Sequence, residues 1–202
     1  MLKNHQYKTI VSLILITLTG MTSYSQGRQV SIAMAQIFCI DGDRPGNFVR
    51  IKNAVTEAVE KGADIVCFPE TSILGWVNPD AHQLAYPVPG KDSDRLCELA
   101  KNNNIFISIG LAEKDGEKLF DAALLIDNKG NILLKHRKIN ILDQLMTPPY
   151  SPGSTIEAVN TQIGRIGILI CADSFQDELL TRMEEQDPDF VIIPYGWAKE
   201  KD

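Results

Sequence analysis

Apolar positions follow two alternating periods along this chain, and these periods predict strands and helices in turn. Residues 30–40 are apolar enough for a buried strand, and residues 63–68 form a second apolar run. Between them, apolar side chains recur three and four positions apart, at Phe48, Ile51, Val55, Ala58 and Val59. Asp43 stands before this stretch as a cap and Gly62 ends it, which predicts an amphipathic helix. A strand, a helix and a strand in this order form a right-handed crossover, so we expect the two strands to be parallel.

The same alternation continues to the end of the chain. The further predicted elements are a helix that begins at Asp92 or Ser93 and ends at residues 102–104, a strand over 105–111, strands 122–126 and 132–134 around the turn 127–130, strands 156–159 and 166–170 around the turn 162–164, a helix over 175–185 and a strand over 190–193. Strands that alternate with helices in this way are typical of an α/β domain.

The first 25 residues have the pattern of a secretory signal peptide. Lys3 and Lys8 precede an apolar run over residues 10–18, and Ser23 and Ser25 are small residues at the two positions that a signal peptidase reads. An uncleaved membrane anchor is the alternative, but the run is well short of the ~20 residues that span a bilayer as a helix. We therefore expect residues 1–25 to be removed, the protein to be exported to the periplasm or outside the cell, and no stable membrane span to be left.

Composition and charge narrow the class of protein. The chain has 202 residues, of which 44% are hydrophobic and 23% charged, as in a globular domain with a core. Its net charge of -6 is unlike the basic surface of a nucleic-acid binder, so we expect no nucleic-acid partner. The sequence has no His-x-x-x-His or Cys-x-x-Cys pair for zinc and no glycine-rich phosphate loop, so we predict no metal and no cofactor.

Three reactive residues stand directly after apolar strands. Glu70 follows the predicted strand 63–68, Lys138 ends the basic stretch after 132–134, and Cys171 follows 166–170. In an open α/β sheet, ligands bind outside the carboxyl ends of the strands, so one acid, one base and one thiol there would share a pocket. Each residue also has an ordinary interpretation: a solvated loop acid, a lysine on an exposed basic surface, and a small buried apolar thiol.

The segments around these residues resemble the carbon–nitrogen hydrolase, or nitrilase, superfamily. They read Phe-Pro-Glu-Thr-Ser-Ile-Leu-Gly-Trp over 68–76, His-Arg-Lys-Ile-Asn over 136–140 and Gly-Ile-Leu-Ile-Cys-Ala-Asp over 167–173, and the match continues with Pro-Asp-Phe-Val-Ile-Ile-Pro over 188–194 and with Trp197. The resemblance implies that residues 26–202 form a four-layer α-β-β-α sandwich, shortened at its C-terminal end, and that the protein is a homodimer or a higher homo-oligomer.

The resemblance also implies a Glu–Lys–Cys active site that cleaves non-peptide C–N bonds. Cys171 would attack the substrate carbon as a thiolate, although an ordinary thiol with a pKa of ~8.5 is only slightly ionised at neutral pH. Glu70 would be the base, and Lys138 and the backbone N–H of Ala172 would stabilise the oxyanion. The expected substrate is a small linear amide or an N-carbamoyl compound, hydrolysed through a Cys thioester.

Five further residues are candidates for the walls of the substrate pocket: Trp76, Met146, Tyr150, Tyr195 and Trp197. Large aromatic side chains near strand ends are as often plain packing, because they bury so much area. Many members of the superfamily also have a second glutamate between the lysine and a Pro-Gly pair. Here that position falls near Met146, and Asp143 is the nearest carboxylate. Either Asp143 substitutes for the glutamate or the pocket is remodelled.

Three functions therefore stay open at this point. The first is an exported amidase-type hydrolase. The second is a catalytically impaired binding or interaction protein that keeps the fold, which the missing glutamate and the short chain both favour. The third is acyl transfer, in which an amine replaces water in resolving the thioester.

Overall fold

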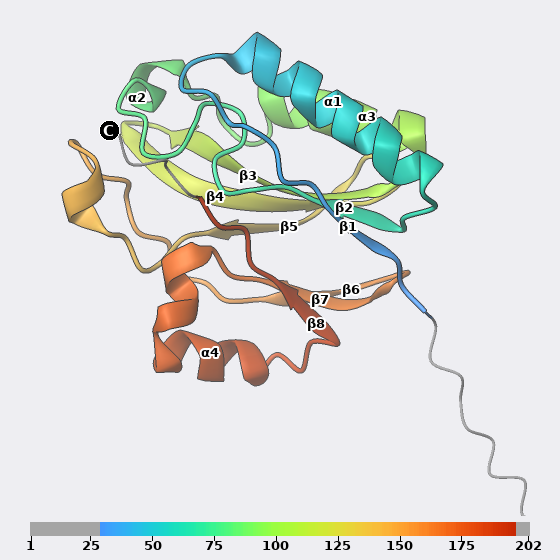
Figure 1. The fold of residues 1–202 in the computed structure, drawn as a ribbon. Coiled ribbons are helices and arrows are strands. Elements are labelled where there is room, and N and C mark those ends of the chain that lie inside the picture. The colour runs from blue at the N-terminus through green and yellow to red at the C-terminus, as the bar shows by residue number, and fades with distance from the viewer. Residues whose placement is uncertain (1–28, 197–202) are drawn as a thin grey trace, which may run out of the picture.

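The computed structural model describes residues 29–196 of the chain, which form four layers (Figure 1). The predicted signal peptide over residues 1–25 and the candidate pocket residue Trp197 lie outside the described residues. The export of the protein therefore stays a prediction.

The larger sheet has five strands in sequence order. They are β1 (Ile32–Met34), β2 (Ile65–Cys67), β3 (Phe106–Asp115), β4 (Lys118–Ile126) and β5 (Ile132–Arg137). The first three are parallel to each other, and β4 and β5 are antiparallel to their neighbours. The parallel pairing of β1 with β2 confirms the crossover expected from the sequence.

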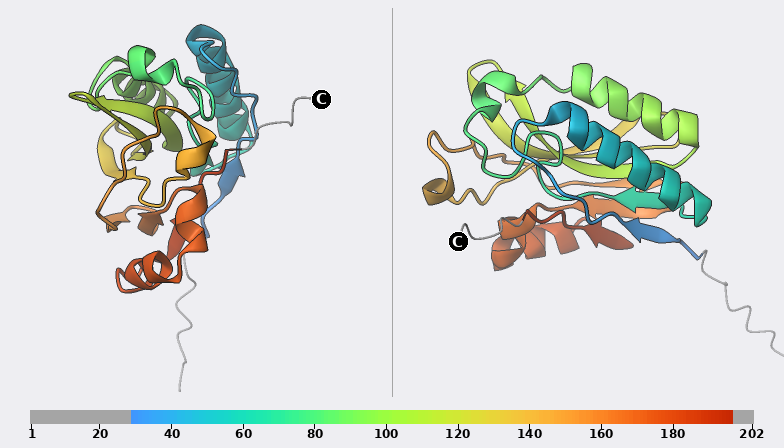
Figure 2. Two further views of the ribbon diagram at one scale, coloured as in Figure 1. Left: turned by 90° about the vertical axis from the view of Figure 1, so that its left-hand side faces the viewer. Right: turned by 45° about the horizontal axis from the view of Figure 1, so that its top comes forward.

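Two long helices cover the outer face of this sheet, α1 (Arg44–Glu60) and α3 (Lys91–Asn103) (Figures 1 and 2). The Asp43 side chain accepts a hydrogen bond from the Gly46 N–H at 3.0 Å and so caps α1, as the sequence predicted. Four of the five periodic apolar residues of α1 are buried, while Val59 is 40% exposed. The periodic pattern thus places the helix correctly but overstates its apolar face by one residue.

The smaller sheet has three strands, β6 (Ala158–Thr161), β7 (Gly164–Ile168) and β8 (Phe190–Ile192), and helix α4 (Asp177–Glu184) lies on its outer side (Figure 1). Buried apolar side chains fill the space between the two sheets, among them Ile65, Phe106, Leu125, Ile166 and Ile168. The order of layers is therefore helices, sheet, sheet, helix, which confirms the four-layer α-β-β-α sandwich.

Three short helical elements were absent from the sequence prediction: α2 (Ala81–Leu84) and the 3₁₀ turns η1 (Asp143–Leu145) and η2 (Cys171–Phe175). Elements this short do not repeat an apolar face, so periodicity does not reveal them. The turn η2 matters for function because it begins at Cys171.

The prediction of a buried strand over residues 30–40 was wrong. Only Ile32–Met34 pair as a strand, and Met34 and Phe38 are 87% and 83% exposed. The reason is position: β1 is the edge of its sheet, and within the described residues it pairs with β2 alone. Apolar composition therefore does not by itself show that a strand lies inside.

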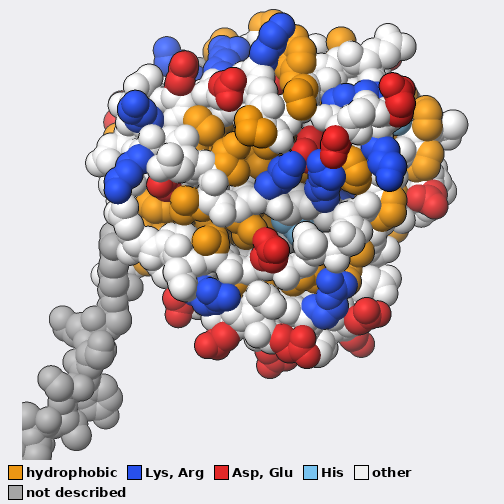
Figure 3. Space-filling view, turned by 180° about the vertical axis from the view of Figure 1, so that it is seen from behind, with side chains coloured by type: hydrophobic (Ala, Val, Ile, Leu, Met, Phe, Trp, Pro, Cys, Tyr) orange, Lys and Arg blue, Asp and Glu red, His pale blue; other side chains and the backbone are white. Residues whose placement is uncertain are grey.

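The surface of the described part carries both signs of charge. Figure 3 shows acidic and basic side chains interspersed over one face of the molecule. Within residues 29–196, no helix is long and apolar enough to cross a bilayer.

Candidate active site

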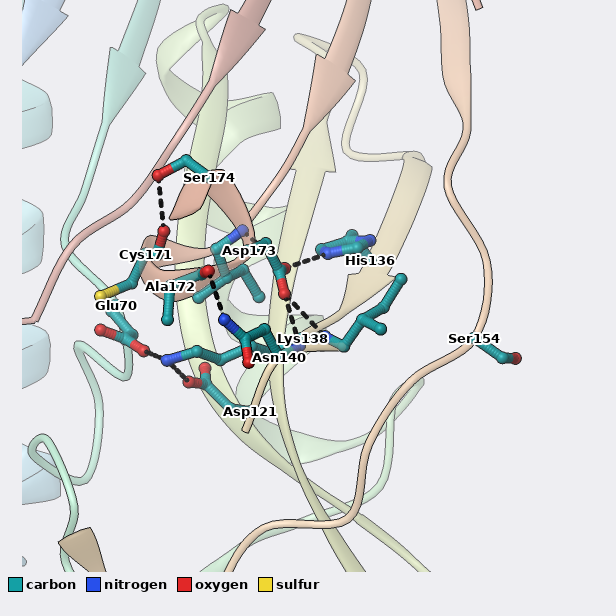
Figure 4. Close-up of polar contacts among 12 residues, drawn as sticks. Glu70, Asp121, His136, Lys138, Asn140, Ser154, Cys171, Ala172, Asp173 and Ser174 are labelled. Carbon is teal, nitrogen blue, oxygen red and sulfur yellow. Dashed lines mark hydrogen bonds and ion pairs between the residues drawn. The ribbon is translucent and has the colours of Figure 1, made fainter. Parts of the chain in front are cut away.

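The structure brings together the three reactive residues that follow the strands. Glu70 comes after β2, Lys138 after β5 and Cys171 after β7, so two layers of the sandwich contribute. The Lys138 Nζ donates a hydrogen bond to Glu70 Oε1 at 2.5 Å, and the Cys171 sulfur lies beside the Glu70 carboxylate (Figure 4). A carboxylate, an ammonium and a thiol thus meet where the two sheets face each other.

Glu70 is fixed by neighbours on both sides and is only 1% exposed. Its Oε2 accepts a hydrogen bond from the Gly196 N–H at 2.6 Å, and its own N–H donates to the Tyr195 carbonyl at 3.2 Å. On β3, a side chain at Gly110 would approach the Glu70 Cα to 2.6 Å and the Pro69 carbonyl to 2.7 Å. Glycine at this position therefore lets the Glu70 segment lie directly on the sheet.

Lys138 is buried, at 6% exposure, so the interpretation of a wet basic surface was wrong for this residue. Its Nζ also lies 3.5 Å from Asp121 Oδ2, and its backbone N–H donates to the Asp121 carbonyl at 2.8 Å. Burial opposes the charged form, but the negative charges of Asp121 and Glu70 outweigh it and raise the pKa of Lys138. The lysine therefore stays an ammonium inside the site.

Cys171 begins the turn η2 with a left-handed backbone, at a φ of 43°. The Cys171 N–H donates to the Pro194 carbonyl at 3.0 Å, and the Cys171 carbonyl accepts a hydrogen bond from the Ser174 hydroxyl at 2.8 Å. The turn is therefore held from both sides. Burial and then the charge of Glu70 raise the pKa of the Cys171 thiol to about 11. All four cysteines of the chain are free thiols, so Cys171 is unpaired but protonated at neutral pH.

The Asp173 carboxylate ties the lysine segment to the cysteine turn. It accepts hydrogen bonds from the backbone N–H groups of Ile139, Asn140 and Ile170 at 2.9, 2.7 and 3.0 Å. It also pairs with His136 Nε2 at 2.8 Å (Figure 4). Burial alone would raise the pKa of Asp173, but these hydrogen bonds outweigh it and lower the pKa.

Asn140 adds a second link between the same two segments. Its Nδ2 donates to the Ala172 carbonyl at 2.7 Å, which fixes the peptide between Ala172 and Asp173. The sequence resemblance predicts a role for Ala172 but none for Asp173 or Asn140, although both stand inside the segments that carry it.

Replacing Asp173 with asparagine is expected to lower the free energy of unfolding by about 2 to 3 kcal/mol, because buried donors lose a charged acceptor. The folded-state pKa of Asp173 is lowered, so its stabilisation is complete well above the ordinary value of 3.8 and is lost as the pH falls below that value. Urea unfolding at pH 7 and at pH 3 checks both points. Asp80→Asn, which changes an exposed aspartate, is the matched control. An equal effect of the two substitutions would contradict this role of Asp173.

A small pocket opens beside Lys138. Its lining includes Glu70, Asp121 and Lys138, together with the predicted wall residues Trp76, Met146 and Tyr150. Tyr195 does not line it: this side chain is 47% exposed, and its hydroxyl lies 2.6 Å from the Ser174 hydroxyl. The structure thus places three of the described wall candidates in the pocket and leaves Tyr195 outside.

The second carboxylate of the site is Asp121 on β4, and not Asp143, the carboxylate nearest in sequence to the expected position of the second glutamate. Asp143 lies on η1, is exposed and is not part of the pocket lining. Asp121 is 2% exposed and contacts Lys138. A signal for it was present in the sequence, because an aspartate interrupts the apolar run over residues 119–126, and a charge inside a buried strand needs a partner.

Comparison with known sequences points to one family. Residues 30–201 match the family model described as "Carbon-nitrogen hydrolase". The chain is 32% identical to Nitrilase 3 of Arabidopsis thaliana over 163 residues, which cover 70% of this chain and 47% of that protein. It is 26% identical to Omega-amidase NIT2 of Mus musculus over 175 residues, which cover 82% and 62% of the two chains. The chain spans about half the length of curated relatives that it matches, 47% of Nitrilase 3 and 53% of the Bifunctional nitrilase/nitrile hydratase NIT4A of Nicotiana tabacum.

Solved structures show the same fold. An amidase from Nesterenkonia sp. matches with a TM-score of 0.78 and 21% identity, over 87% of this chain and 68% of that chain. A mutant of the same amidase, which carries the acetamide moiety of fluoroacetamide on its active-site cysteine, matches with a TM-score of 0.78 and 20% identity, over 87% and 68% of the two chains.

Proposed function

Because the chain belongs to the carbon–nitrogen hydrolase family, we propose that it hydrolyses the C–N bond of a small linear amide or N-carbamoyl compound. Cys171 is the nucleophile, Glu70 the base and Lys138 the oxyanion ligand in this proposal. The observation that carries it is the contact of Lys138 with Glu70 beside the Cys171 sulfur (Figure 4). Glu70 and Lys138 also line a pocket. The curated relatives named as nitrilases and an amidase support the class of reaction.

In the first half of the reaction, the Cys171 sulfur attacks the carbonyl carbon and forms a tetrahedral intermediate. The thiol has a pKa of about 11, so it gives up its proton only as the C–S bond forms, and Glu70 is the nearest acceptor. Glu70 then passes this proton to the leaving nitrogen as the C–N bond breaks. Ammonia or an amine departs, and the acyl group stays on the sulfur as a thioester.

The negative charge that develops on the carbonyl oxygen needs donors in place before the attack. The Lys138 ammonium supplies one, because its raised pKa keeps it charged in the buried site. The backbone N–H of Ala172, directly after the nucleophile, is the second donor in this proposal.

In the second half, a water molecule hydrolyses the thioester. Glu70 takes a proton from the water as its oxygen attacks the acyl carbon, and the proton returns to the sulfur as the C–S bond breaks. The products are a carboxylic acid and the free thiol. The large side chains of Trp76, Met146 and Tyr150 line the pocket, which favours a short acyl chain.

The test of this proposal is the release of ammonia by the purified full chain from a panel of linear amides and N-carbamoyl compounds. We expect release from at least one of them and, after rapid quenching, an acyl mass increment on the Cys171 peptide by mass spectrometry. Cys171→Ala should show neither signal.

Two other outcomes would replace the proposal. Acyl adducts that turn over only when hydroxylamine is added, with formation of a hydroxamate, would identify acyl transfer. A folded chain that forms no adduct and releases no ammonia from any compound would favour the binding protein.

A further inference from the structure

Two of the residues that line the pocket each have a buried polar atom for which the described part of the chain offers no hydrogen-bond partner. Among the residues that the structure describes, five buried side-chain atoms lack a hydrogen bond, and of their residues only Asp121 and Tyr150 line the pocket. The atoms are Asp121 Oδ1 and the Tyr150 hydroxyl, on side chains that are 2% and 8% exposed. Buried polar atoms are nearly always paired, so two orphans in one pocket point to a ligand that supplies their partners.

The other two charged side chains of the pocket, Glu70 and Lys138, already have partners. Glu70 accepts hydrogen bonds from Lys138 and from the Gly196 N–H, and Lys138 lies between Glu70 and Asp121 Oδ2 (Figure 4). Asp121 thus uses one carboxyl oxygen towards Lys138 and leaves the other open. Burial and the charge of Glu70 raise the pKa of Asp121, and burial and then the nearby carboxyls raise the pKa of Tyr150. Each group can accept a hydrogen bond through its unpaired oxygen.

The chemistry of the substrate decides what fits between these two atoms. Under the proposed function, the substrate carbonyl oxygen faces Lys138 and the backbone N–H of Ala172. The polar group left on an unsubstituted amide is then its NH₂, which has two N–H donors and no good acceptor. The neighbouring lining side chains Trp76, Leu142 and Met146 offer it no acceptor oxygen. Two donors thus meet two open acceptor atoms.

We propose that Asp121 and Tyr150 form a subsite for the NH₂ group of a terminal carboxamide, so that the site selects unsubstituted –C(=O)NH₂ compounds over N-substituted amides. This inference rests on the proposed function for the position of the carbonyl group. Methyl groups on the nitrogen remove the donors and leave both buried acceptors unpaired, which is a strong basis for discrimination. Linear amides and N-carbamoyl compounds share this terminal group.

The subsite is tested by alkylation of Cys171, which needs no turnover. The full chain is treated with 2-iodoacetamide or with 2-iodo-N,N-dimethylacetamide at pH 7.5, and the rates at the Cys171 peptide are divided by those of glutathione. We expect the wild type to prefer the unsubstituted reagent by about tenfold or more. In Tyr150→Phe and Asp121→Ala we expect this preference to fall to about threefold or less, because the unsubstituted reagent loses an acceptor for its N–H groups.

Tyr150→Phe is the decisive variant, because it removes only an oxygen that has no partner and should fold normally. Asp143→Asn is the matched control, since this carboxylate is exposed and outside the pocket lining, and the preference of this variant should equal that of the wild type.

The subsite is refuted by an absent preference in the wild type, by an unchanged preference in Tyr150→Phe, or by an equal loss of rate with both reagents. A preference without ammonia release would refute the hydrolase alone, and ammonia release without a preference would refute the subsite alone.

Discussion

Replacing Glu70 with glutamine is expected to reduce kcat about a thousandfold and, at the same time, to make the Cys171 thiol easier to ionise. The loss of rate follows because glutamine cannot take the thiol proton, and general base catalysis contributes about 10²–10⁴-fold. The second effect follows from the site's charges. Glu70 raises the pKa of Cys171 to about 11 together with burial, while Lys138 lowers it. Without the carboxylate, Lys138 acts alone and the thiol pKa falls.

The two effects are measured on the same protein. Ammonia release gives kcat, and the pH dependence of iodoacetamide alkylation at the Cys171 peptide gives the thiol pKa. We expect the alkylation midpoint to move down in Glu70→Gln although turnover is nearly lost. Glu117→Gln, at an exposed position, should leave both measurements unchanged. Turnover within about tenfold of the wild type would assign the base to another residue, and an unmoved midpoint would show that Glu70 does not control the thiol.

Replacing Lys138 with methionine is expected to reduce kcat by about 10²–10³-fold, because one preorganised donor to the oxyanion is lost. We also expect a lower free energy of unfolding, by about 3 to 5 kcal/mol, since Glu70 and Asp121 lose the cation they share in a buried site. From the sequence alone, replacing a lysine at an exposed strand end is expected to reduce the rate far more than the free energy of unfolding. The burial of Lys138 changes that expectation.

The pH dependence of this loss has a definite sign. Burial and the charge of Glu70 already raise the pKa of Asp121, and Lys138 is the group that opposes this rise. A carboxyl whose folded-state pKa is raised loses stability as the pH rises through that pKa. Lys138→Met should therefore be less stable at pH 8 than at pH 5, measured against the wild type by urea unfolding.

Lys52→Met is the control for charge and side-chain size, because Lys52 is exposed on α1. We expect this substitution to leave both the rate and the free energy of unfolding unchanged. A loss of stability in Lys138→Met that is equal at pH 5 and pH 8 would show that the two carboxyls do not depend on the lysine.

Local sequence patterns were sufficient to place most of the fold. A long amphipathic period and the Asp43 cap located α1 within two residues of each end. The Asp-Asn-Lys-Gly turn located the hairpin of β4 and β5 in the same way. These features succeed because hydrogen bonds and apolar faces along the chain depend on near neighbours in sequence.

The same patterns failed where burial depends on what lies opposite. The run over residues 30–40 is as apolar as a core strand, yet β1 is a sheet edge with exposed side chains. Tyr195 directly follows the segment 188–194, which is part of the resemblance, but its hydroxyl contacts the Ser174 hydroxyl outside the pocket. In both cases the partner element, not the residue type, sets the exposure.

The sequence by itself determined the family, the four layers and the three residues that stand after strands. Only the tertiary structure decided the charge balance around them. It placed the Asp121 carboxyl against Lys138, left Asp143 in solvent, and joined the lysine segment to the cysteine turn through Asp173. The physical reason is that electrostatic interactions depend on distance and burial in space, and residues tens of positions apart come within hydrogen-bonding distance only when the sheets pack.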